Sequence, residues 1–394
     1  SDDCFIVLRK IFFDYGYHRY TKLFNKICLF FHSVVYLFQI YYMVNHFNRE
    51  LFYTMSLQMI IFVFILATMV SSIYFEDDIA LLLDLFITSS WSIESAGVET
   101  QNLIIKKSRT INIFNYAALS LFAFSATILL PVFGDVSELF LCIRVFDEYF
   151  GVWSKIPNLF YFSTLHFMFY SAIRLGYLFL YGILNIQIQI VILGEHILQI
   201  SNDYDDVDEW QKLYNTAYQK EMYKRLRFCI KQHATLKICI TKLLTTVTSV
   251  MFIFVVLGIS ATADTIFFMF CNLKNQDNLL KLRLLSIAFC NGFVVFLFCE
   301  GGEGLIDEVF SQTQDFISIS STFLQTGHIF NNLMDCPWYL WNTKNRLLLL
   351  TFMTNCLQPL KFSVAGIALN RQLAASITKV SLSFANVLYN LKQF

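Results

Sequence analysis

Long runs of apolar residues, separated by short polar segments, dominate the pattern along this chain. A membrane-spanning helix needs about 17 to 25 apolar residues. Six runs reach that length: 24–45, 51–75, 110–133, 159–193, 243–271 and 283–299. A final apolar region, 347–391, contains Pro359, which removes a backbone donor and restricts the residue before it. We therefore predict two helices there, 345–358 and 366–391, that count as one span, and an all-α polytopic membrane protein with seven spans.

The distribution of basic residues predicts the orientation of these spans. Cytoplasmic loops of membrane proteins carry an excess of Lys and Arg. With the amino end in the cytoplasm, the inside segments hold eighteen basic residues and the outside segments hold six. Eight of the eighteen lie between Lys212 and Lys242. We therefore expect a cytoplasmic amino end and an external carboxyl end.

Some helical patterns continue beyond the length of a bilayer. The fourth runs from Leu159 to Ile200, and the fifth begins near Glu209, well before its apolar part. We expect these extensions to pack together in the cytoplasm as a helical anchor domain, to which 76–105 can add a helix. The predicted segments are an amino-terminal segment 1–23, spans one to four with their extension 24–200, an anchor region 201–242, spans five and six 243–304, a polar loop with an anchor helix 305–344, and the split seventh span 345–394.

Composition supports the membrane assignment and excludes some functions. Hydrophobic residues make up 56% of the 394, and only 15% are charged, against about 25% in soluble proteins. The net charge of zero gives no global field for nucleic acid. The ten cysteines form no CxxC pair, and a bridge between Cys142 and Cys271 stays an open alternative. No signal peptide heads the chain, so the first span is expected to direct insertion, and Ser at position 1 indicates that a natural start is missing.

Catalytic signatures are absent from the sequence. It contains no HExxH, GxSxG, Walker or GxGxxG motif, and the histidines stand singly. Glu195-His196 lies at a predicted helix end, where a cation suits the terminal carbonyls. The glycine cluster at 300–304 is too short to cradle phosphate. We predict a protein that is no enzyme and needs no cofactor or metal.

A polar stripe marks the last predicted helix. Its members are spaced three and four residues apart, which places them on one helical face. They are Ser376, Lys379, Ser383, Asn386 and Asn390. Lipid cannot satisfy such a face, so it meets either a partner helix or a water-filled path. The sequence leaves both alternatives open.

The outer halves of the second to sixth runs combine aromatic residues with sparse polar groups. Such a lining suits a small, uncharged ligand, although core packing uses the same residues. The candidate ligand-binding residues are Met59, Phe62, Ser120, Phe124, Ser125, His166, Phe169, Tyr170 and Ile173. Arg174 lies within the fourth run, where an ionisable group is costly unless it is paired or wetted. We therefore expect Arg174 to be functional or tied to a partner.

The carboxyl-terminal part of the chain resembles the insect odorant receptors. The resemblance rests on Pro337-Trp338-Tyr339, Arg346 with its four leucines, Gln358-Pro359-Leu360, Ala365-Gly366 and the run 377–388. Residues 226–233 look like the family's lead-in to the fifth span, and Cys299, Gly302 and Glu303 look like the end of the sixth. An inside amino terminus also matches that family and differs from G-protein-coupled receptors.

This resemblance implies a tetrameric, ligand-gated, non-selective cation channel with an odorant pocket in the outer half of each subunit. The second half of the seventh span would line the pore through Ser383, Asn386, Val387 and Asn390, with Val387 as the hydrophobic gate. Tyr389 and Lys392 depart from the residues commonest in the family. The chain lacks the co-receptor's long insertion before the fifth span, so it resembles a tuning subunit that assembles with the co-receptor.

The same resemblance implies a multi-pass protein in the plasma membrane of olfactory sensory neuron dendrites. The aromatic pocket favours an ester, alcohol or terpenoid as ligand. A gustatory receptor channel is one alternative, although its closing motif is present only in the weakened form Ser383-Phe384 and Asn390-Leu391. A membrane transporter is another alternative, because the Pro359 break allows a discontinuous helix.

Overall fold

The computed structural model describes residues 3–201, 208–272, 278–310, 326–356, 363–364, 367–368 and 371–393. The protein is built almost entirely from helices, as predicted. The α-helices are α1 Ile6–Arg9, α2 Arg19–Asn45, α3 Arg49–Tyr74, α4 Glu76–Ser89, α5 Val98–Ile128, α6 Leu141–Phe150, α7 Lys155–Ser163, α8 Leu165–Leu198, α9 Glu209–Tyr214, α10 Thr216–Asn272, α11 Asn278–Phe310, α12 Thr326–Asp335, α13 Thr343–Cys356 and α14 Arg371–Gln393. A π-helical turn, η1 Lys10–Tyr15, follows α1, and short 3₁₀ turns lie at Ile93–Ala96, Pro131–Phe133, Gly151–Ser154 and Trp338–Leu340.

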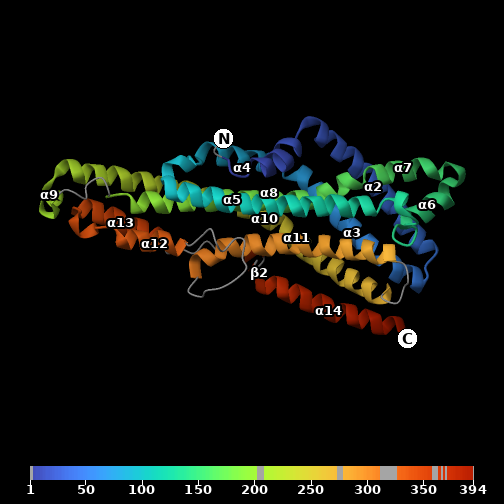
Figure 1. Ribbon diagram of the computed structural model, residues 1–394. Coiled ribbons are helices and arrows are strands. Elements are labelled where there is room, and N and C mark those ends of the chain that lie inside the picture. The colour runs from blue at the N-terminus through green and yellow to red at the C-terminus, as the bar shows by residue number, and fades with distance from the viewer. Residues whose placement is uncertain are drawn as a thin grey trace.

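The helices run lengthwise through an elongated bundle (Figure 1). At 1.5 Å per residue, α10 with its 57 residues is about 85 Å long, and α8 with 34 residues is about 50 Å long. A bilayer core is only about 30 Å thick. Both helices therefore extend well past any membrane that they cross, which agrees with the expected cytoplasmic extensions.

The final apolar region forms two separate helices, as predicted, whereas their role as one split span stays a prediction. α13 ends at Cys356 and α14 begins at Arg371, and between them β1 (Ser363–Val364) pairs antiparallel with β2 (Ile367–Ala368). These two-residue strands are the only departure from an all-α fold in the part of the chain that the structure describes. The predicted break at Gln358-Pro359 and the motif Ala365-Gly366 lie outside the described residues.

The number of spans stays a prediction. Among the described residues, four helical stretches are long and apolar enough to cross a membrane, and a fifth is formed if the bent pair α3 and α4 counts as one. That pair bends by 64°. The four are Arg19–Asn45, Val98–Ile128, Leu141–Leu198 and Asn278–Val295. Among the described residues, α10 also contains a shorter apolar stretch at Val255–Phe270.

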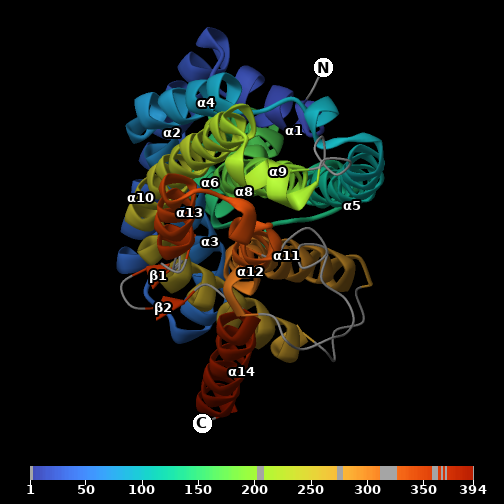
Figure 2. The ribbon, with the colours of Figure 1, turned by 90° about the vertical axis from the view of Figure 1, so that its left-hand side faces the viewer.

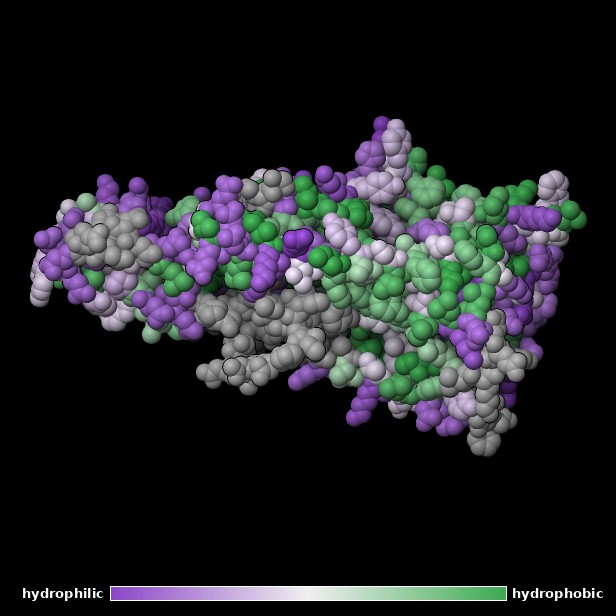
Figure 3. Space-filling view, in the orientation of Figure 1, coloured by the Kyte–Doolittle hydropathy of each residue, from purple (hydrophilic) through white to green (hydrophobic). Residues whose placement is uncertain are grey.

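Surface hydropathy separates the molecule into zones. On the face shown in Figure 3, an apolar belt covers the middle and right of the molecule, and hydrophilic residues gather at the two ends. The buried apolar residues form two clusters. One extends along α8 and α10 into α12 and α13, and the other joins α2, α3, α6, α7 and the first turns of α11. We call the region of α9, α12, α13 and the parts of α8 and α10 packed on them the anchor bundle. The region of α6, α7 and the parts of α2 and α3 packed on them is the cavity end.

Buried polar side chains hold the anchor bundle together. Gln219 of α10 donates to the carbonyls of Lys212 and Leu340, at 3.1 and 2.8 Å, and accepts from the backbone N–H of Asn342 at 2.8 Å. Asn345 of α13 donates to the carbonyl of Gln219 at 2.9 Å. The fully buried Trp341 donates its indole N–H to the Tyr218 hydroxyl at 3.2 Å. The Pro337-Trp338-Tyr339 motif thus leads into the segment that joins α12 and α13 to α10.

The structure bears on two details of the sequence interpretation. Cys142 is a free, fully buried thiol, and the side chain of Cys271, the other half of the alternative bridge, lies outside the described residues. His196 lies in the last turn of α8, where its ring packs edge-on against Trp91 and its Nε2 atom is 3.2 Å from the Ser95 hydroxyl. The interpretation of Glu195-His196 as a helix-end feature is therefore confirmed.

Candidate functional site

An apolar cavity lies where the cavity end meets the middle of the bundle. Its volume is about 90 Å³. Residues from α3, α5, α8, α10, α11 and the 129–140 segment form its wall. They are Gln58, Ile61, Phe62, Phe64, Ile65, Phe122, Leu129, Leu139, Phe140, Leu165, Phe169, Ala172, Ile173, Phe268, Ile287, Cys290, Asn291 and Val294. A wall of this composition suits a small apolar molecule.

Two amides provide most of the polarity of this wall. Asn291 of α11 donates to the Thr265 hydroxyl at 2.9 Å, which ties α11 to α10. Gln58 of α3 is 8% exposed, and its Oε1 atom accepts from the backbone N–H of Leu141. The Nε2 atom of Gln58 is buried without a hydrogen-bond partner in the described part of the chain. The cavity therefore has an amide donor at its edge, close to the Tyr161 hydroxyl.

Three of the nine predicted ligand-binding residues line this cavity: Phe62, Phe169 and Ile173. The other six lie outside its wall. Met59 packs in the cavity-end core, Ser120 is exposed, and Phe124 is 52% exposed on the outside of α5. Ser125 is buried and donates to the Leu121 carbonyl. His166 is exposed, with Nε2 3.0 Å from the Thr127 hydroxyl, and Tyr170 donates to the Ile11 carbonyl at 2.8 Å.

Sequence patterns missed part of the wall. Phe268, Ile287 and Val294 lie in the fifth and sixth apolar runs and look like ordinary core residues. Asn291 did carry a signal, because it is a lone amide within the apolar run 283–299. A polar side chain in a spanning helix is expected to face protein rather than lipid.

A buried polar cluster adjoins the cavity at the cavity end. His32 of α2 bonds to the Thr164 hydroxyl at 2.8 Å, and Tyr161 of α7 stacks on the cavity residue Phe62 with ring centroids 5.7 Å apart. Gln39 of α2 is fully buried, and among the described residues neither of its side-chain polar atoms has a partner at hydrogen-bonding geometry. The Tyr161 hydroxyl also lacks a partner at hydrogen-bonding geometry, although it interacts with Gln39 and Gln58. Buried polar groups of this kind normally bind water or a polar ligand group.

The predicted tie of Arg174 is present, and it holds the amino-terminal segment. Arg174 is 2% exposed and donates to the Gly16 carbonyl at 3.0 Å, with its guanidinium over the Tyr17 ring at 5.0 Å. Gly16 is required here, because an added Cβ would collide with the Phe12 carbonyl and lie 2.8 Å from the Tyr170 hydroxyl. The aromatic ring of Phe12 stacks on Tyr177 of α8 at 4.5 Å.

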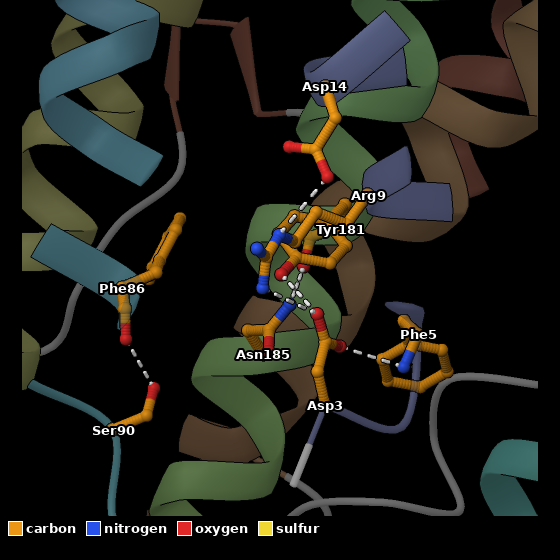
Figure 4. A network of polar contacts seen from close by, with 8 residues as sticks. All are labelled: Asp3, Phe5, Arg9, Asp14, Phe86, Ser90, Tyr181 and Asn185. Carbon is orange, nitrogen blue, oxygen red and sulfur yellow. Dashed lines mark hydrogen bonds and ion pairs between the residues drawn. The ribbon is translucent and has the colours of Figure 1, made fainter. Parts of the chain in front are cut away.

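A second polar network holds the start of the chain on the same helix (Figure 4). Tyr181 of α8 donates to the Asp3 carboxylate at 3.0 Å. Arg9 lies between Asp3 and Asp14, with nitrogen–oxygen distances of 3.6 and 3.8 Å. Residues 3–18 are therefore an ordered part of the bundle that runs beside the cavity-lining residues of α8.

A second buried arginine, Arg283 at the start of α11, was not singled out by the sequence. Its guanidinium donates to the carbonyls of Ile128 and Asp135, at 3.0 and 2.6 Å. It thereby closes the end of α5 and fixes the loop that contributes Leu129 to the cavity. The backbone and side chain of Ser137 both donate to Asp135 and lower the pKa of this exposed loop carboxyl.

The four predicted pore residues all lie on the exposed side of α14. One face of α14, formed by Ile377, Ser381 and Ala385, is buried, and the Ser381 hydroxyl donates to the Ile259 carbonyl of α10 at 3.3 Å. Figure 2 shows α14 at the periphery of the bundle, where its buried face packs on α10. At 100° per residue, the predicted polar stripe lies opposite this buried face. Ser383, Asn386, Val387 and Asn390 are exposed, Val387 by 50%.

These features define a helical membrane protein with an internal apolar cavity and a peripheral terminal helix that has an exposed polar face. A search of solved structures finds a close likeness to the insect olfactory receptor OR5 from Machilis hrabei, with a TM-score of 0.69 at 12% sequence identity. The alignment covers 95% of this chain and 90% of that one. No protein-family model and no curated protein matches the sequence.

This likeness establishes the fold of the chain. The resemblance to insect odorant receptors, inferred from the carboxyl-terminal motifs, is therefore confirmed at the level of the fold. The similarity extends over the amino-terminal half as well, where the sequence offered spans but no specific motif.

Proposed function

We propose that this chain is an odour-tuning subunit of an insect odorant-receptor channel. It binds a small volatile molecule in the apolar cavity and gates a non-selective cation pore together with the shared co-receptor, in the plasma membrane of olfactory sensory neuron dendrites. The observation that carries this proposal is the likeness to an insect olfactory receptor over 95% of the chain. The cavity and the polar face of α14 supply the two parts that such a function needs.

The chemistry of the cavity indicates the class of ligand. Its wall is apolar except for a few groups, so burial of ligand surface contributes about 25 cal/mol per Å². No carboxylate or basic side chain lines it, which disfavours an ionised acid or amine. The buried Nε2 donor of Gln58 favours a ligand with one hydrogen-bond acceptor. An ester, an alcohol or an oxygenated terpenoid fits this combination.

The exposed face of α14 supports a pore shared between subunits. The lysine, serine and asparagine side chains on this face are exposed in the described part of the chain. Lipid cannot provide the hydrogen-bond partners that these side chains need. Several copies of α14 around one axis would turn these residues toward water. Val387 would then provide an aliphatic constriction that closes the path by dewetting.

A direct route connects the cavity to the pore helix. Phe268 of α10 lines the cavity, and Phe270, two residues further on, packs edge-on against Tyr389 of α14 with ring centroids 6.4 Å apart. A ligand that binds the open state more tightly than the closed state shifts the equilibrium toward opening. In this proposal, the ligand moves the end of α10, and Tyr389 transmits this movement to α14.

Odour-evoked currents from the chain co-expressed with the co-receptor test the ligand part. With a panel of esters, alcohols and terpenoids, Phe169→Ala is expected to raise the half-maximal concentration at least about tenfold, because a buried aromatic side chain contributes roughly 1.5–3 kcal/mol. Phe124→Ala is the matched control, since Phe124 is half-exposed and outside the wall. Equal effects of both variants would refute the cavity as the ligand site.

The pore part has its own test. Val387→Ala is expected to raise the current without ligand, because a smaller side chain weakens the hydrophobic constriction. Val256→Ala is the control, since Val256 of α10 is 47% exposed and Val387 is 50% exposed. Asn390→Ala is expected to alter conductance or ion selectivity. Unchanged gating and conductance in both α14 variants would refute the pore, and substrate uptake without current would favour a transporter instead.

A further inference from the structure

A second hollow lies between the amino-terminal segment and the start of α2. It is an open groove of about 870 Å³. Three elements form it: residues 10–18, the first two turns of α2, and one residue of α8. The lining residues are Lys10, Asp14, Tyr15, His18, Tyr20, Thr21, Leu23, Phe24, Ile27 and Phe167.

The groove changes in polarity along its length. Its amino-terminal end contains Lys10 and His18, and aromatic rings of Tyr15 and Tyr20 follow. Apolar side chains continue from there along α2, where the seven residue steps from Tyr20 to Ile27 cover about 10 Å. Near this end, Phe24 packs edge-on against Phe167 of α8 with ring centroids 4.8 Å apart. Leu23 and Ile27 stay 58% and 47% exposed.

The charges around the polar end are unbalanced. The acidic residue of the groove, Asp14, pairs with Arg9, and Lys22 on the far side of α2 pairs with Glu76. Among the described residues, no ion pair involves Lys10, Arg19 or Lys26, and all three are exposed. Arg19 and Lys26 share one flank of α2 beside the groove. An anionic group in the groove would therefore find basic partners, and the acidic residue of the lining, Asp14, is already paired with Arg9.

The floor of the groove is fixed rather than loose. The clamp of Arg174 on Gly16 and the Asp3–Arg9–Asp14 network hold residues 3–18 on α8 (Figure 4). Tyr15 packs edge-on against Tyr170 of α8 at 6.4 Å. The basic residues of the segment thus keep a constant position relative to the apolar face of α2.

We propose that this groove binds one anionic phospholipid of the cytoplasmic leaflet. The headgroup phosphate and carboxylate lie against Lys10, His18 and Arg19. An acyl chain lies along Leu23, Ile27 and Phe167. Tyr15 and Tyr20 lie at the level of the glycerol, where aromatic rings with polar tips are favoured at a membrane interface. Basic pockets on the cytoplasmic side of membrane helices bind such headgroups. The leaflet follows from the orientation that the basic residues predict, and the binding itself needs neither odorant nor co-receptor.

Lipid retention by the purified full-length chain in detergent tests this proposal. The chain is mixed with equal amounts of phosphatidylserine and phosphatidylcholine, and the bound lipid is measured by native mass spectrometry. The wild type is expected to retain phosphatidylserine in preference. The double variant Lys10→Gln with Arg19→Gln is expected to reduce this preference roughly thirtyfold, from the typical contribution of two basic residues near anionic lipid.

A matched control separates the groove from general charge effects. Arg144→Gln with Lys155→Gln removes two exposed basic residues at the cavity end and is expected to leave the preference unchanged. Equal retention of both lipids by the wild type would overturn the proposal, and so would an equal loss in the control. Competition by soluble glycerophosphoserine at the same concentration would also overturn it, because it would show an anion site that needs no acyl chain.

Discussion

The anchor bundle and the cavity end both bury polar side chains, but they treat them in opposite ways. In the anchor bundle, Gln219 makes hydrogen bonds to several backbone and side-chain groups on α9, α10, α13 and the segment before α13. At the cavity end, Gln39 is fully buried, and among the described residues neither polar atom of its side chain has a partner at hydrogen-bonding geometry. The anchor bundle therefore satisfies its buried polar side chains with internal hydrogen bonds, which favours stability. The cavity end leaves buried polar groups that water or a ligand can bind.

Trp341 gives the largest expected effect in this comparison. Trp341→Ala removes a fully buried indole from the anchor bundle and is expected to lower the free energy of unfolding by about 3–5 kcal/mol. Thermal melting of the purified chain, followed by size-exclusion fluorescence, measures the change. Trp338→Ala is the control, since Trp338 is 45% exposed and is expected to change the melting temperature little. Similar losses in both variants would contradict the role of Trp341 as the central packing residue.

The two glutamines test the comparison directly. Gln219→Met is expected to destabilise the chain by about 1–3 kcal/mol, because it leaves buried donors and acceptors without partners. Gln39→Met is expected to leave the melting temperature unchanged or to raise it, because it removes polar atoms that have no hydrogen bond to lose. The same melting assay serves both variants. A loss of stability in Gln39→Met as large as that in Gln219→Met would show that the cavity end is satisfied by bound water.

Gln58 sharpens the functional side of the comparison. Gln58→Met is expected to weaken the response to a ligand with a carbonyl acceptor by roughly tenfold, since a hydrogen bond contributes about 0.5–1.5 kcal/mol and its loss leaves the acceptor unsatisfied. The response to a hydrocarbon of the same shape is expected to change much less. Currents recorded with the two ligands in parallel provide the measurement. An equal loss for both would indicate a change in packing rather than a lost donor.

The smallest expected effect is a pH dependence in the anchor bundle. Burial, with a contribution from Lys237, lowers the pKa of His233 below its usual value of 6.5. The ring of His233 packs on Phe352 at 5.3 Å, and its Nε2 atom is 3.9 Å from the Cys356 sulfur. Because the unfolded chain takes up the proton first, stability is full above about pH 6.5 and falls below it. His233→Gln is expected to flatten this part of the profile of melting temperature against pH.

Residue patterns alone determined much of this protein. Apolar runs predicted the helices, because a chain in lipid has to satisfy its backbone polar groups within each segment. Pro359 predicted that α13 and α14 are separate helices. The spacing of polar residues by three and four predicted the polar face of α14. Local spacing suffices for these features, since the residues involved lie within one helix.

Only the tertiary structure decided which residues share a site. Phe169 and Phe124 look alike in the sequence, but one lines the cavity and the other faces outward, because the rotation of each helix depends on its neighbours. The position of the amino-terminal segment was also decided by the tertiary structure. The sequence predicts only a cytoplasmic segment, whereas in the fold Arg174 holds this segment on α8. Contacts between residues 158 positions apart, such as Arg174 with Gly16, leave no periodic signal in a single sequence.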